Sequence, residues 1–285
     1  MYKRMLTTII ILLMVSIQSM IAQTTNMEKP KTTGYARVNG IKMYYEIYGD
    51  GHIPLVLIHG GGSTIESSFG NMIPLLSDYG KLIGVELQAH GRTSDRNAPE
   101  TFEQDADDVA ALLKYLKIDK ANFLGFSNGG TTTTQIAIRH PEIVNKIVVI
   151  SSNLKRDGMI PGFFDGMKTA TLQNMPKGLQ EAYLKVTPDK NGLQTMFEKD
   201  RDRMINYKDI PDDLIRSIKA PALLMVADHD VVTTEHVLKM SHLIPDARFA
   251  AFPGVHGSFI GEAETVVQGS KMPAMTAMLV KEFLE

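Results

Sequence analysis

The sequence predicts an α/β protein with a mainly parallel β-sheet, helices on both faces of the sheet and a helical segment inserted between two strands. Three observations support this class. Short apolar runs alternate with segments of helical spacing along most of the chain. Several runs are apolar at every position, which is typical of strands covered on both faces. The segment 154–219 breaks the alternation, because it has no apolar strand and is divided by four prolines.

The individual elements can be assigned in order along the chain. The run 41–48 alternates and is rich in β-branched and aromatic residues, so it predicts a strand, placed at an antiparallel edge of the sheet. Further strands are expected at 55–59, 82–87, 122–126, 147–150, 223–227 and 248–252. Helices are expected at 103–116, 131–139, 235–243 and 274–284, and Pro273 suits the first turn of the last one.

The length of 285 residues suits one large domain with an insertion. We expect a core formed by 33–153 and 220–285, with 154–219 as a helical cap. This cap is rich in methionine and phenylalanine. Ordinary packing of the cap helices is the expected role of these side chains, and a tolerant apolar acyl pocket is the alternative.

Residues 1–22 have the pattern of a secretory signal peptide. Lys3 and Arg4 precede an uncharged stretch whose apolar centre, 9–17, is shorter than the roughly 20 apolar residues that span a bilayer. We expect cleavage after Ala22, a polar linker at 23–32, and a periplasmic or secreted mature protein without a membrane span. An uncleaved membrane anchor is the alternative for the same pattern.

Composition excludes several classes of function. The formal net charge is −2, so no strong basic field points to nucleic acid. The chain has no cysteine, which excludes disulfides, a thiol nucleophile and thiolate metal sites. Neither a nucleic-acid partner nor thiol chemistry is therefore expected.

The central functional motif is Gly125-Phe126-Ser127-Asn128-Gly129, where a predicted strand ends and a helix begins. A sharp turn at this point lifts the serine out, and the small flanking residues leave room for that turn. The following helix points backbone N–H groups at negative charge that forms beside the serine. A plain glycine turn is the alternative, which the preceding strand and the following helix disfavour. We therefore predict Ser127 as a nucleophile.

A serine hydroxyl needs an activating base, and the base needs an orienting carboxylate. His256 follows the last predicted strand and Asp230 follows the strand before it. Functional sites assemble in such loops, at the carboxyl ends of parallel strands. Asp228 competes with Asp230, but it lies nearer the strand, where closing the turn is its ordinary role. We predict His256 as the base and Asp230 as its partner.

The negative oxygen of an acyl-transfer intermediate needs two preorganised donors. The N–H of Asn128, directly after the nucleophile, is one candidate. The other is expected from the segment His59-Gly60-Gly61-Gly62, and we assign it to Gly61, because glycine lets the backbone approach a reacting carbonyl closely. A flexible glycine loop is the alternative for this segment.

Together, these motifs and their order Ser…Asp…His resemble those of the α/β-hydrolase superfamily. The segment 86–93, Glu-Leu-Gln-Ala-His-Gly-Arg-Thr, is similar to the segment after strand four in small esterases, perhydrolases and C–C hydrolases. The resemblance covers about 33–285. It implies an eight-stranded core, a helical cap over the site, and neither a metal nor an organic cofactor. It also gives Ser127, His256, Asp230, Gly61 and Asn128 the roles described above.

The resemblance narrows the reaction. Ser127 occupies the place of the aspartate nucleophile in epoxide hydrolases and haloalkane dehalogenases of this fold. The chain has no tryptophan, a residue that often lines the acyl pocket of perhydrolases. We therefore predict a serine hydrolase that cleaves small-molecule carboxylic esters or lactones through an acyl-enzyme. The alternatives are a C–C bond hydrolase or perhydrolase of the same fold, and a non-catalytic ligand-binding receptor.

Arginines of the cap are further candidates for substrate binding. Arg156, Arg201 and Arg203 could bind a substrate carboxylate. Solvated surface charge is the ordinary role of arginine, and it is the role that we expect for these three.

Overall fold

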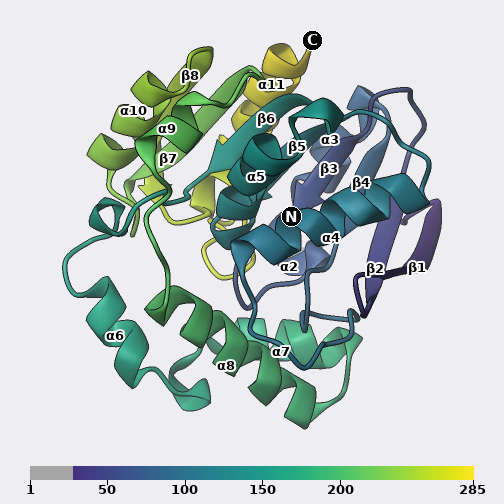
Figure 1. Cartoon of the computed structure of the whole chain (residues 1–285), viewed down its shortest axis with the longest axis vertical. Helices are drawn as coiled ribbons and strands as arrows, with labels where there is room; N and C mark the ends of the chain where they lie inside the picture. The colour runs from purple at the N-terminus through teal and green to yellow at the C-terminus, as the bar shows by residue number, and fades with distance from the viewer. Residues whose placement is uncertain (1–27) are drawn as a thin grey trace, which may run out of the picture.

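The computed structural model describes residues 28–285, so the expected signal peptide and the first part of the linker lie outside the described residues. Eight strands form one sheet in the order β1-β2-β4-β3-β5-β6-β7-β8 (Figure 1). The strands are β1 (Thr32–Val38), β2 (Ile41–Tyr48), β3 (Leu55–Ile58), β4 (Leu82–Val85), β5 (Ala121–Phe126), β6 (Val144–Ile150), β7 (Ala222–His229) and β8 (Ala247–Val255). The predicted α/β class with a mainly parallel sheet is confirmed.

Antiparallel pairing is confined to one side of the sheet. Strands β3 to β8 pair in parallel, whereas β2 pairs antiparallel with both β1 and β4. The prediction placed 41–48 at the edge, but this strand, β2, lies second and β1 forms the edge. Asn39 and Gly40 both have positive φ, 43° and 88°, which suits a tight hairpin turn between the two strands. This turn folds β1 back onto β2, so that the two strands pair antiparallel.

Ten α-helices connect or follow these strands within residues 28–285. They are α2 (Ile65–Phe69), α3 (Ile73–Leu76), α4 (Phe102–Tyr115), α5 (Asn128–Arg139), α6 (Phe163–Thr169), α7 (Lys177–Val186), α8 (Lys190–Ile205), α9 (Asp212–Arg216), α10 (Thr234–Leu243) and α11 (Met272–Leu284). Every helix in this part of the chain is too short or too polar to cross a membrane.

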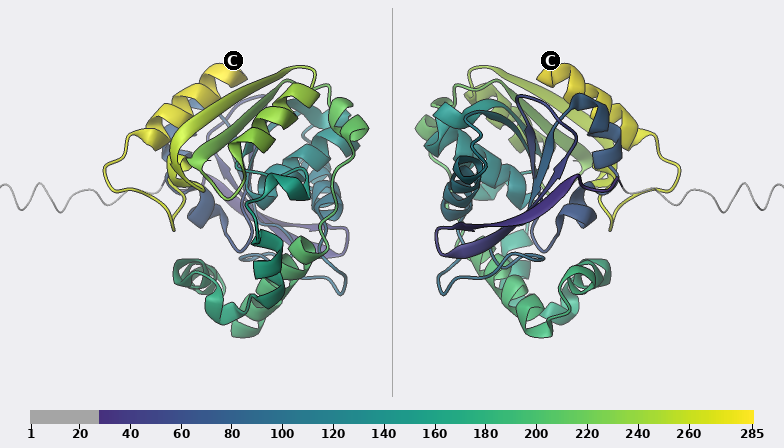
Figure 2. Two further views of the ribbon diagram at one scale, coloured as in Figure 1. Left: turned by 90° about the vertical axis from the view of Figure 1, so that its left-hand side faces the viewer. Right: turned by 90° about the vertical axis from the view of Figure 1, so that its right-hand side faces the viewer.

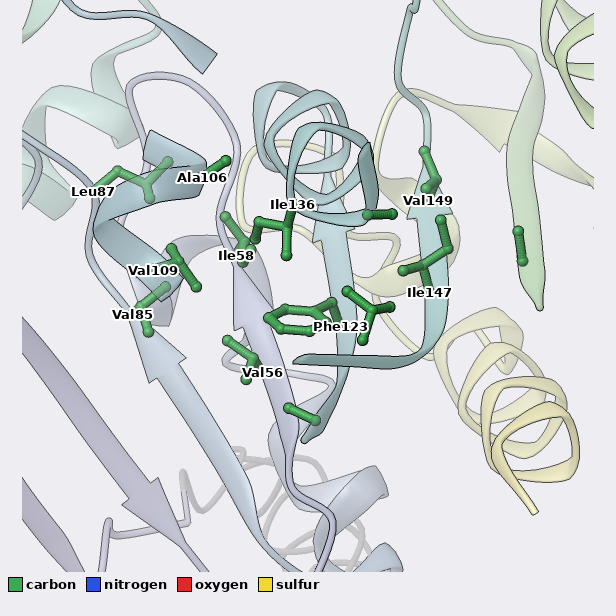
Figure 3. Packing of buried hydrophobic residues seen from close by; sticks show 14 of the residues in the cluster. Val56, Ile58, Val85, Leu87, Ala106, Val109, Phe123, Ile136, Ile147 and Val149 are labelled. Carbon is green, nitrogen blue, oxygen red and sulfur yellow. The ribbon is translucent and has the colours of Figure 1, made fainter. Parts of the chain in front are cut away.

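The strands carry apolar side chains on both faces, because each face is covered by helices. Val56 and Ile58 of β3 belong to the apolar cluster on one face, which also includes residues of α4, α5 and α10; Figure 3 shows the first two helices. Leu55 and Leu57 point to the other face and pack with α2, α3 and α11. This alternation explains why β3 is apolar at every position.

The segment between β6 and β7 forms a layer of its own. Helices α6, α7 and α8 lie together below the sheet, beyond the ends of the strands that carry the loops of the site (Figure 2). The described structure has no strand within 154–219. This is the segment in which the sequence predicted a helical cap, and we refer to α6, α7 and α8 as the cap.

Candidate active site

Ser127 lies in a sharp turn between β5 and α5. Its φ of 54° and ψ of −123° are unusual for a residue with a side chain. The turn brings β5 and α5 so close that a Cβ on Gly125 would lie 2.0 Å from the Gly129 carbonyl oxygen, and one on Gly129 would lie 2.1 Å from that of Ile58. Only glycine fits at either position, so the motif around Ser127 reflects this close approach.

His256 and Asp230 lie next to Ser127, in loops that follow β8 and β7. The Ser127 hydroxyl is 3.0 Å from Nε2 of His256, and Nδ1 of His256 is 2.6 Å from Oδ1 of Asp230. The ring of Phe126 packs against the imidazole, with ring centroids 4.8 Å apart. The structure thus brings together the three residues that the sequence singled out, in the order needed for proton transfer from serine to histidine.

The Asp230 carboxylate is fully buried. Burial alone would raise its pKa, but the hydrogen bond and charge of His256, and then the Ser151 hydroxyl and the Val232 N–H, hold the pKa below its ordinary value. Ser151 donates at 2.6 Å and Val232 at 3.1 Å. Asp230 is therefore ionised beside the imidazole. The sequence missed Ser151, which directly follows β6 and has a positive φ of 50°.

Asp228, the competing carboxylate, has a different role. Its side chain accepts a hydrogen bond from the Gly254 N–H at 2.8 Å, and the residue is exposed. This contact ties the end of β7 to the end of β8. Asp228 therefore links two neighbouring strands instead of closing a turn, and Asp230 contacts His256.

Gly61 and Asn128 lie on the wall of the cavity onto which Ser127 opens. Within residues 28–285, neither backbone N–H donates to a protein acceptor. The loop that carries Gly61 also approaches the nucleophile closely, since a Cβ on Gly60 would lie 3.2 Å from Cβ of Ser127. Two free backbone donors thus flank the serine, which is the arrangement that an oxyanion needs.

The cavity beside Ser127 has a volume of about 260 Å³. Its wall is largely apolar and comes mostly from the cap helices and the segments that connect them. The apolar cap residues on the wall are Phe163, Met167, Ala170, Met175, Pro176, Leu179, Met196, Phe197 and Met204. Most of the methionine and phenylalanine side chains of the cap thus face this cavity, which favours the pocket interpretation over helix packing alone.

A cluster of buried charged groups that the sequence did not predict lies behind the glycine loop. Asp200 and Arg203 come from α8, and His90, Glu100 and Asp105 come from the core. Arg203 contacts Asp200, lies 2.7 Å from Asp105 and lies 3.1 Å from Glu100. His90 Nε2 lies 2.9 Å from Asp200. We call these five residues the cap-core ion cluster.

The ion cluster corrects the expectation of solvated charge for Arg203, whose side chain is only 2% exposed. Arg156 is not freely solvated either, because its guanidinium lies 3.6 Å from the centre of the Phe164 ring and donates to the Tyr207 carbonyl. Arg201 is the exception, because it pairs with the exposed Asp202 and also reaches the cavity wall. Arginine in a cap segment carries no sequence signal that distinguishes these environments.

His90, Glu100 and Asp200 place possible metal-ligand atoms within 4.8 Å of one another. The guanidinium of Arg203 is already bound to both carboxylates of this group. A divalent cation at this point would be repelled by Arg203, so the arrangement fits an internal ion-pair cluster better than a metal site.

The family model described as alpha/beta hydrolase fold matches residues 53–204, just over half of the chain, so the protein belongs to the alpha/beta hydrolase fold family. Among curated proteins, the chain is similar to human Serine hydrolase BPHL, with 28% identity over 70% of each chain. It is also similar to the Bifunctional esterase/perhydrolase DCH of Acinetobacter calcoaceticus, with 22% identity over 80% of this chain and 94% of that protein.

Solved structures share the same fold. The meta-cleavage product hydrolase CumD of Pseudomonas fluorescens IP01 superimposes with a TM-score of 0.72 and 21% identity, over 90% of this chain and 97% of that one. At this level of identity, the likeness extends to the fold and not to the substrate.

Proposed function

We propose that this protein is a serine hydrolase that cleaves carboxylic esters or lactones with small apolar acyl groups. The observation that carries the proposal is the continuous hydrogen-bonded series Ser127–His256–Asp230, with distances of 3.0 and 2.6 Å, which opens onto an apolar cavity. Two free backbone N–H groups beside the serine complete the requirements for acyl transfer.

The reaction follows from this geometry. The Ser127 oxygen attacks the substrate carbonyl while Nε2 of His256 takes the hydroxyl proton. The N–H groups of Gly61 and Asn128 stabilise the negative oxygen that forms. His256 then gives its proton to the leaving alcohol, and the acyl group stays on Ser127. In a lactone, the alcohol remains attached to that acyl group.

Deacylation repeats these steps with water in place of Ser127 as the nucleophile. His256 takes a proton from water, the water oxygen attacks the acyl carbonyl, and Ser127 leaves with the proton that His256 returns. The ionised Asp230 stabilises the imidazolium in both halves of the reaction and fixes which ring nitrogen faces Ser127. No group beyond those of the chain and water takes part in these steps.

The relatives support hydrolysis without choosing the bond. The similar protein from Acinetobacter calcoaceticus is named as an esterase and perhydrolase. The similar structure from Pseudomonas fluorescens is named as a meta-cleavage product hydrolase. C–C bond hydrolysis is the second candidate, because Arg201 places a cation on the wall of a largely apolar cavity. A substrate with a carboxylate beside the bond that breaks would use this cation.

The proposal is tested by the hydrolysis of p-nitrophenyl esters from acetate to decanoate, with the Ser127→Ala variant alongside. Loss of the nucleophile should lower kcat by about 10⁴–10⁶ and leave the protein folded. The matched control is Ser217→Ala, since Ser217 is exposed and its hydroxyl donates to the Leu214 carbonyl, away from the site. If the Ser127→Ala variant still hydrolysed the esters at the wild-type rate, the assignment of Ser127 as the nucleophile would be wrong.

The alternatives give different results in the same samples. A protein that hydrolyses no ester or lactone, but reacts at Ser127 with a fluorophosphonate and cleaves a vinylogous 1,5-diketone, is a C–C hydrolase. A protein that binds esters without turnover and does not react with the fluorophosphonate is a receptor. Either result would replace the ester and lactone proposal.

We also propose that the protein acts outside the cytoplasm. This rests only on the pattern of residues 1–22, with its two basic residues and short apolar run. Expression of the full chain in a bacterium, followed by intact-mass measurement of the periplasmic fraction, should give a mature protein that begins at Gln23. A full-length mass in the cytoplasmic fraction would contradict the proposal.

A further inference from the structure

The carboxylate of Asp200, on the cap helix α8, receives donors from its own helix and from three other parts of the molecule. It accepts hydrogen bonds from the Gly62 N–H, from His90 Nε2 at 2.9 Å, from the Asn128 side-chain amide at 3.3 Å and from Arg203. The side chain is only 12% exposed. A single cap residue therefore joins the glycine loop, the loop that holds His90 and the start of α5.

Both proposed oxyanion donors lie beside these contacts. The Gly62 N–H belongs to the residue next to Gly61, and the amide bound to Asp200 is the side chain of Asn128 itself. A Cβ on Gly61 would lie 3.1 Å from Oδ2 of Asp200. The carboxylate thus supports the oxyanion loop directly behind the two free N–H groups.

While Asp200 is ionised beside His90, no other group in the cluster accepts from Gly62. His90 Nε2 lies 3.2 Å from the Gly62 nitrogen. However, Nδ1 of His90 faces the Gln88 carbonyl at 2.8 Å and Nε2 faces Asp200, so both ring nitrogens donate and the ring is an imidazolium. A protonated nitrogen cannot accept, which leaves the carboxylate of Asp200 as the partner of Gly62.

The charge of Asp200 also has to be cancelled. An isolated carboxylate so close to the oxyanion hole would destabilise the negative oxygen that forms during acyl transfer. Arg203 and the His90 imidazolium both contact Asp200, and together they neutralise its charge. The carboxylate can therefore hold the glycine loop without working against the oxyanion.

We propose that Asp200 is a positioning residue for the oxyanion hole, so that the hole is complete only while the cap helix α8 is docked on the core. The inference rests on the proposed acyl-transfer function. Asp200 does not touch the reacting atoms; it fixes the Gly61 and Asn128 N–H groups through their neighbours. Docking of the cap around a substrate and assembly of the catalytic donors are thereby one event.

The test compares Asp200→Ala and Asp200→Asn with the wild-type protein. The control is Asp202→Asn on the same helix, an exposed carboxylate that pairs with Arg201. Two quantities are measured: kcat and KM for a hydrolysed p-nitrophenyl ester, and the second-order rate of Ser127 labelling by a fluorophosphonate. In phosphonylation the phosphoryl oxygen occupies the oxyanion hole, so the labelling rate reports on the hole without any need for the natural substrate.

Asp200→Ala should lower kcat and the labelling rate together by about 10²–10³, the effect of losing one oxyanion donor, while KM changes by less than about threefold. Asp200→Asn keeps a carbonyl that can accept from Gly62, so its loss should be about tenfold. This isosteric variant decides the question if the alanine variant does not fold. Asp202→Asn should match the wild type.

A merely structural role gives a different pattern. Unchanged kcat and labelling rate in a folded Asp200 variant, an increase in KM alone, or an equal loss in Asp202→Asn would each overturn the inference. The proposed function fails separately. If the wild-type protein hydrolyses no ester but is labelled rapidly, the substrate proposal is wrong, and the labelling rates of the variants still decide the role of Asp200.

Discussion

Ser127 adopts a positive φ that residues with a side chain rarely adopt, at a typical cost of about 1–3 kcal/mol. The surrounding packing maintains this conformation. Gly125 and Gly129 let β5, β3 and α5 approach within distances that exclude a Cβ at either glycine. At the scale of single residues, the exposure of the nucleophile therefore depends on the absence of side chains at Gly125 and Gly129.

The close approach at Gly129 gives a stability prediction. Gly129→Ala would place a methyl group 2.1 Å from the Ile58 carbonyl oxygen, and backbone cannot move as easily as a flexible side chain. We expect a loss of about 3 kcal/mol or more in the free energy of unfolding, measured by urea denaturation.

The matched control for this prediction is Gly166→Ala. Gly166 lies within helix α6, and a Cβ there would contact nothing within 4 Å. Because alanine favours a helix over glycine, this substitution should raise stability by about 0.5–1 kcal/mol. Equal effects at the two positions would show that the close approach at Gly129 is not tight.

Ser151 gives a second prediction at this scale. Its hydroxyl donates to the buried Asp230 carboxylate at 2.6 Å, so Ser151→Ala leaves that charge with one donor fewer. We expect a loss of about 1.5–3 kcal/mol in the free energy of unfolding, the usual range for a hydrogen bond to a charged group. Ser217→Ala, which removes an exposed hydroxyl bound to the Leu214 carbonyl, should change stability by less than about 0.5 kcal/mol. Similar values for both variants in urea denaturation would contradict the role given to Ser151.

The three residues of the hydrogen-bonded series could be predicted from the sequence, because their positions after predicted strands indicate where they lie in the fold. Ser127, Asp230 and His256 each follow a predicted strand, and the parallel sheet brings such positions to one edge. Ser151 and Asp200 carry no comparable signal, because a single serine or aspartate is ordinary in any segment. Their roles arise from contacts across 79 and 138 positions of the chain, which only the folded structure shows.

At the scale of elements, helix α8 has two functional sides. Met196, Phe197 and Met204 line the cavity, Arg203 faces the core, and Asp200 lies between the two sides and contacts both. Charged residues in a helix are usually solvated, so the sequence suggested an exposed face where the structure has a buried one. The charges could not be assigned in advance, because their partners Glu100 and Asp105 lie in another part of the chain.

The ion cluster predicts a dependence of stability on pH. Burial raises the pKa of Glu100 to about 8, against the lowering effects of Arg203 and His90. Burial would lower the pKa of His90, but the charges of Asp200 and Glu100 raise it to about 9. Both groups bind a proton more tightly in the folded protein than in the unfolded chain. Their contribution to stability is therefore complete below their ordinary pKa values and is lost as pH rises through the raised ones.

We accordingly expect Tm to fall by about 4 °C or more between pH 6.5 and pH 9.5, measured by scanning calorimetry. Glu100→Gln carries no charge at any pH, so its Tm should fall less steeply over this range. Glu103→Gln, an exposed position on α4, is the control and should follow the wild-type curve. Parallel curves for wild type and Glu100→Gln would show that Glu100 is not protonated in the folded protein.

Arg203 connects α8 to the core through two acidic groups, Glu100 and Asp105, and its removal tests that connection. Arg203→Met keeps much of the side-chain volume but leaves those carboxylates buried with only His90 as a cation. We expect a loss of about 3–5 kcal/mol in urea denaturation. Adding Asp105→Asn should recover part of this loss, since it removes one unpaired charge.

The stability control for Arg203 is Arg201→Met. Arg201 pairs with the exposed Asp202, and such exposed pairs contribute at most about 1 kcal/mol. A comparable loss in both arginine variants would mean that the buried pairs do not fasten the cap to the core.

At the scale of the whole molecule, the sheet and the cap contribute different things. Parallel strands β5, β7 and β8 bring the nucleophile, the carboxylate and the base to one edge, and α6, α7 and α8 lie beyond that edge (Figure 2). Strand order and motif order made the convergence of these three residues predictable. The placement of the cap helices was not, because their apolar sides fit either mutual packing or a cavity wall, and only the shape of the core beneath them distinguishes the two.

The size of the cavity beside Ser127 gives the last prediction. The cavity of about 260 Å³ is smaller than the roughly 300–1,000 Å³ typical of sites for drug-sized ligands. We therefore expect kcat/KM for p-nitrophenyl esters to be highest at short acyl chains and to fall toward decanoate. Phe197→Ala removes an aromatic ring from the wall, so kcat/KM for decanoate should rise about tenfold or more relative to acetate. Met278→Ala, an exposed position on α11, should leave this ratio unchanged. A preference that does not change in Phe197→Ala would mean that the acyl chain does not enter the space between the cap and Ser127.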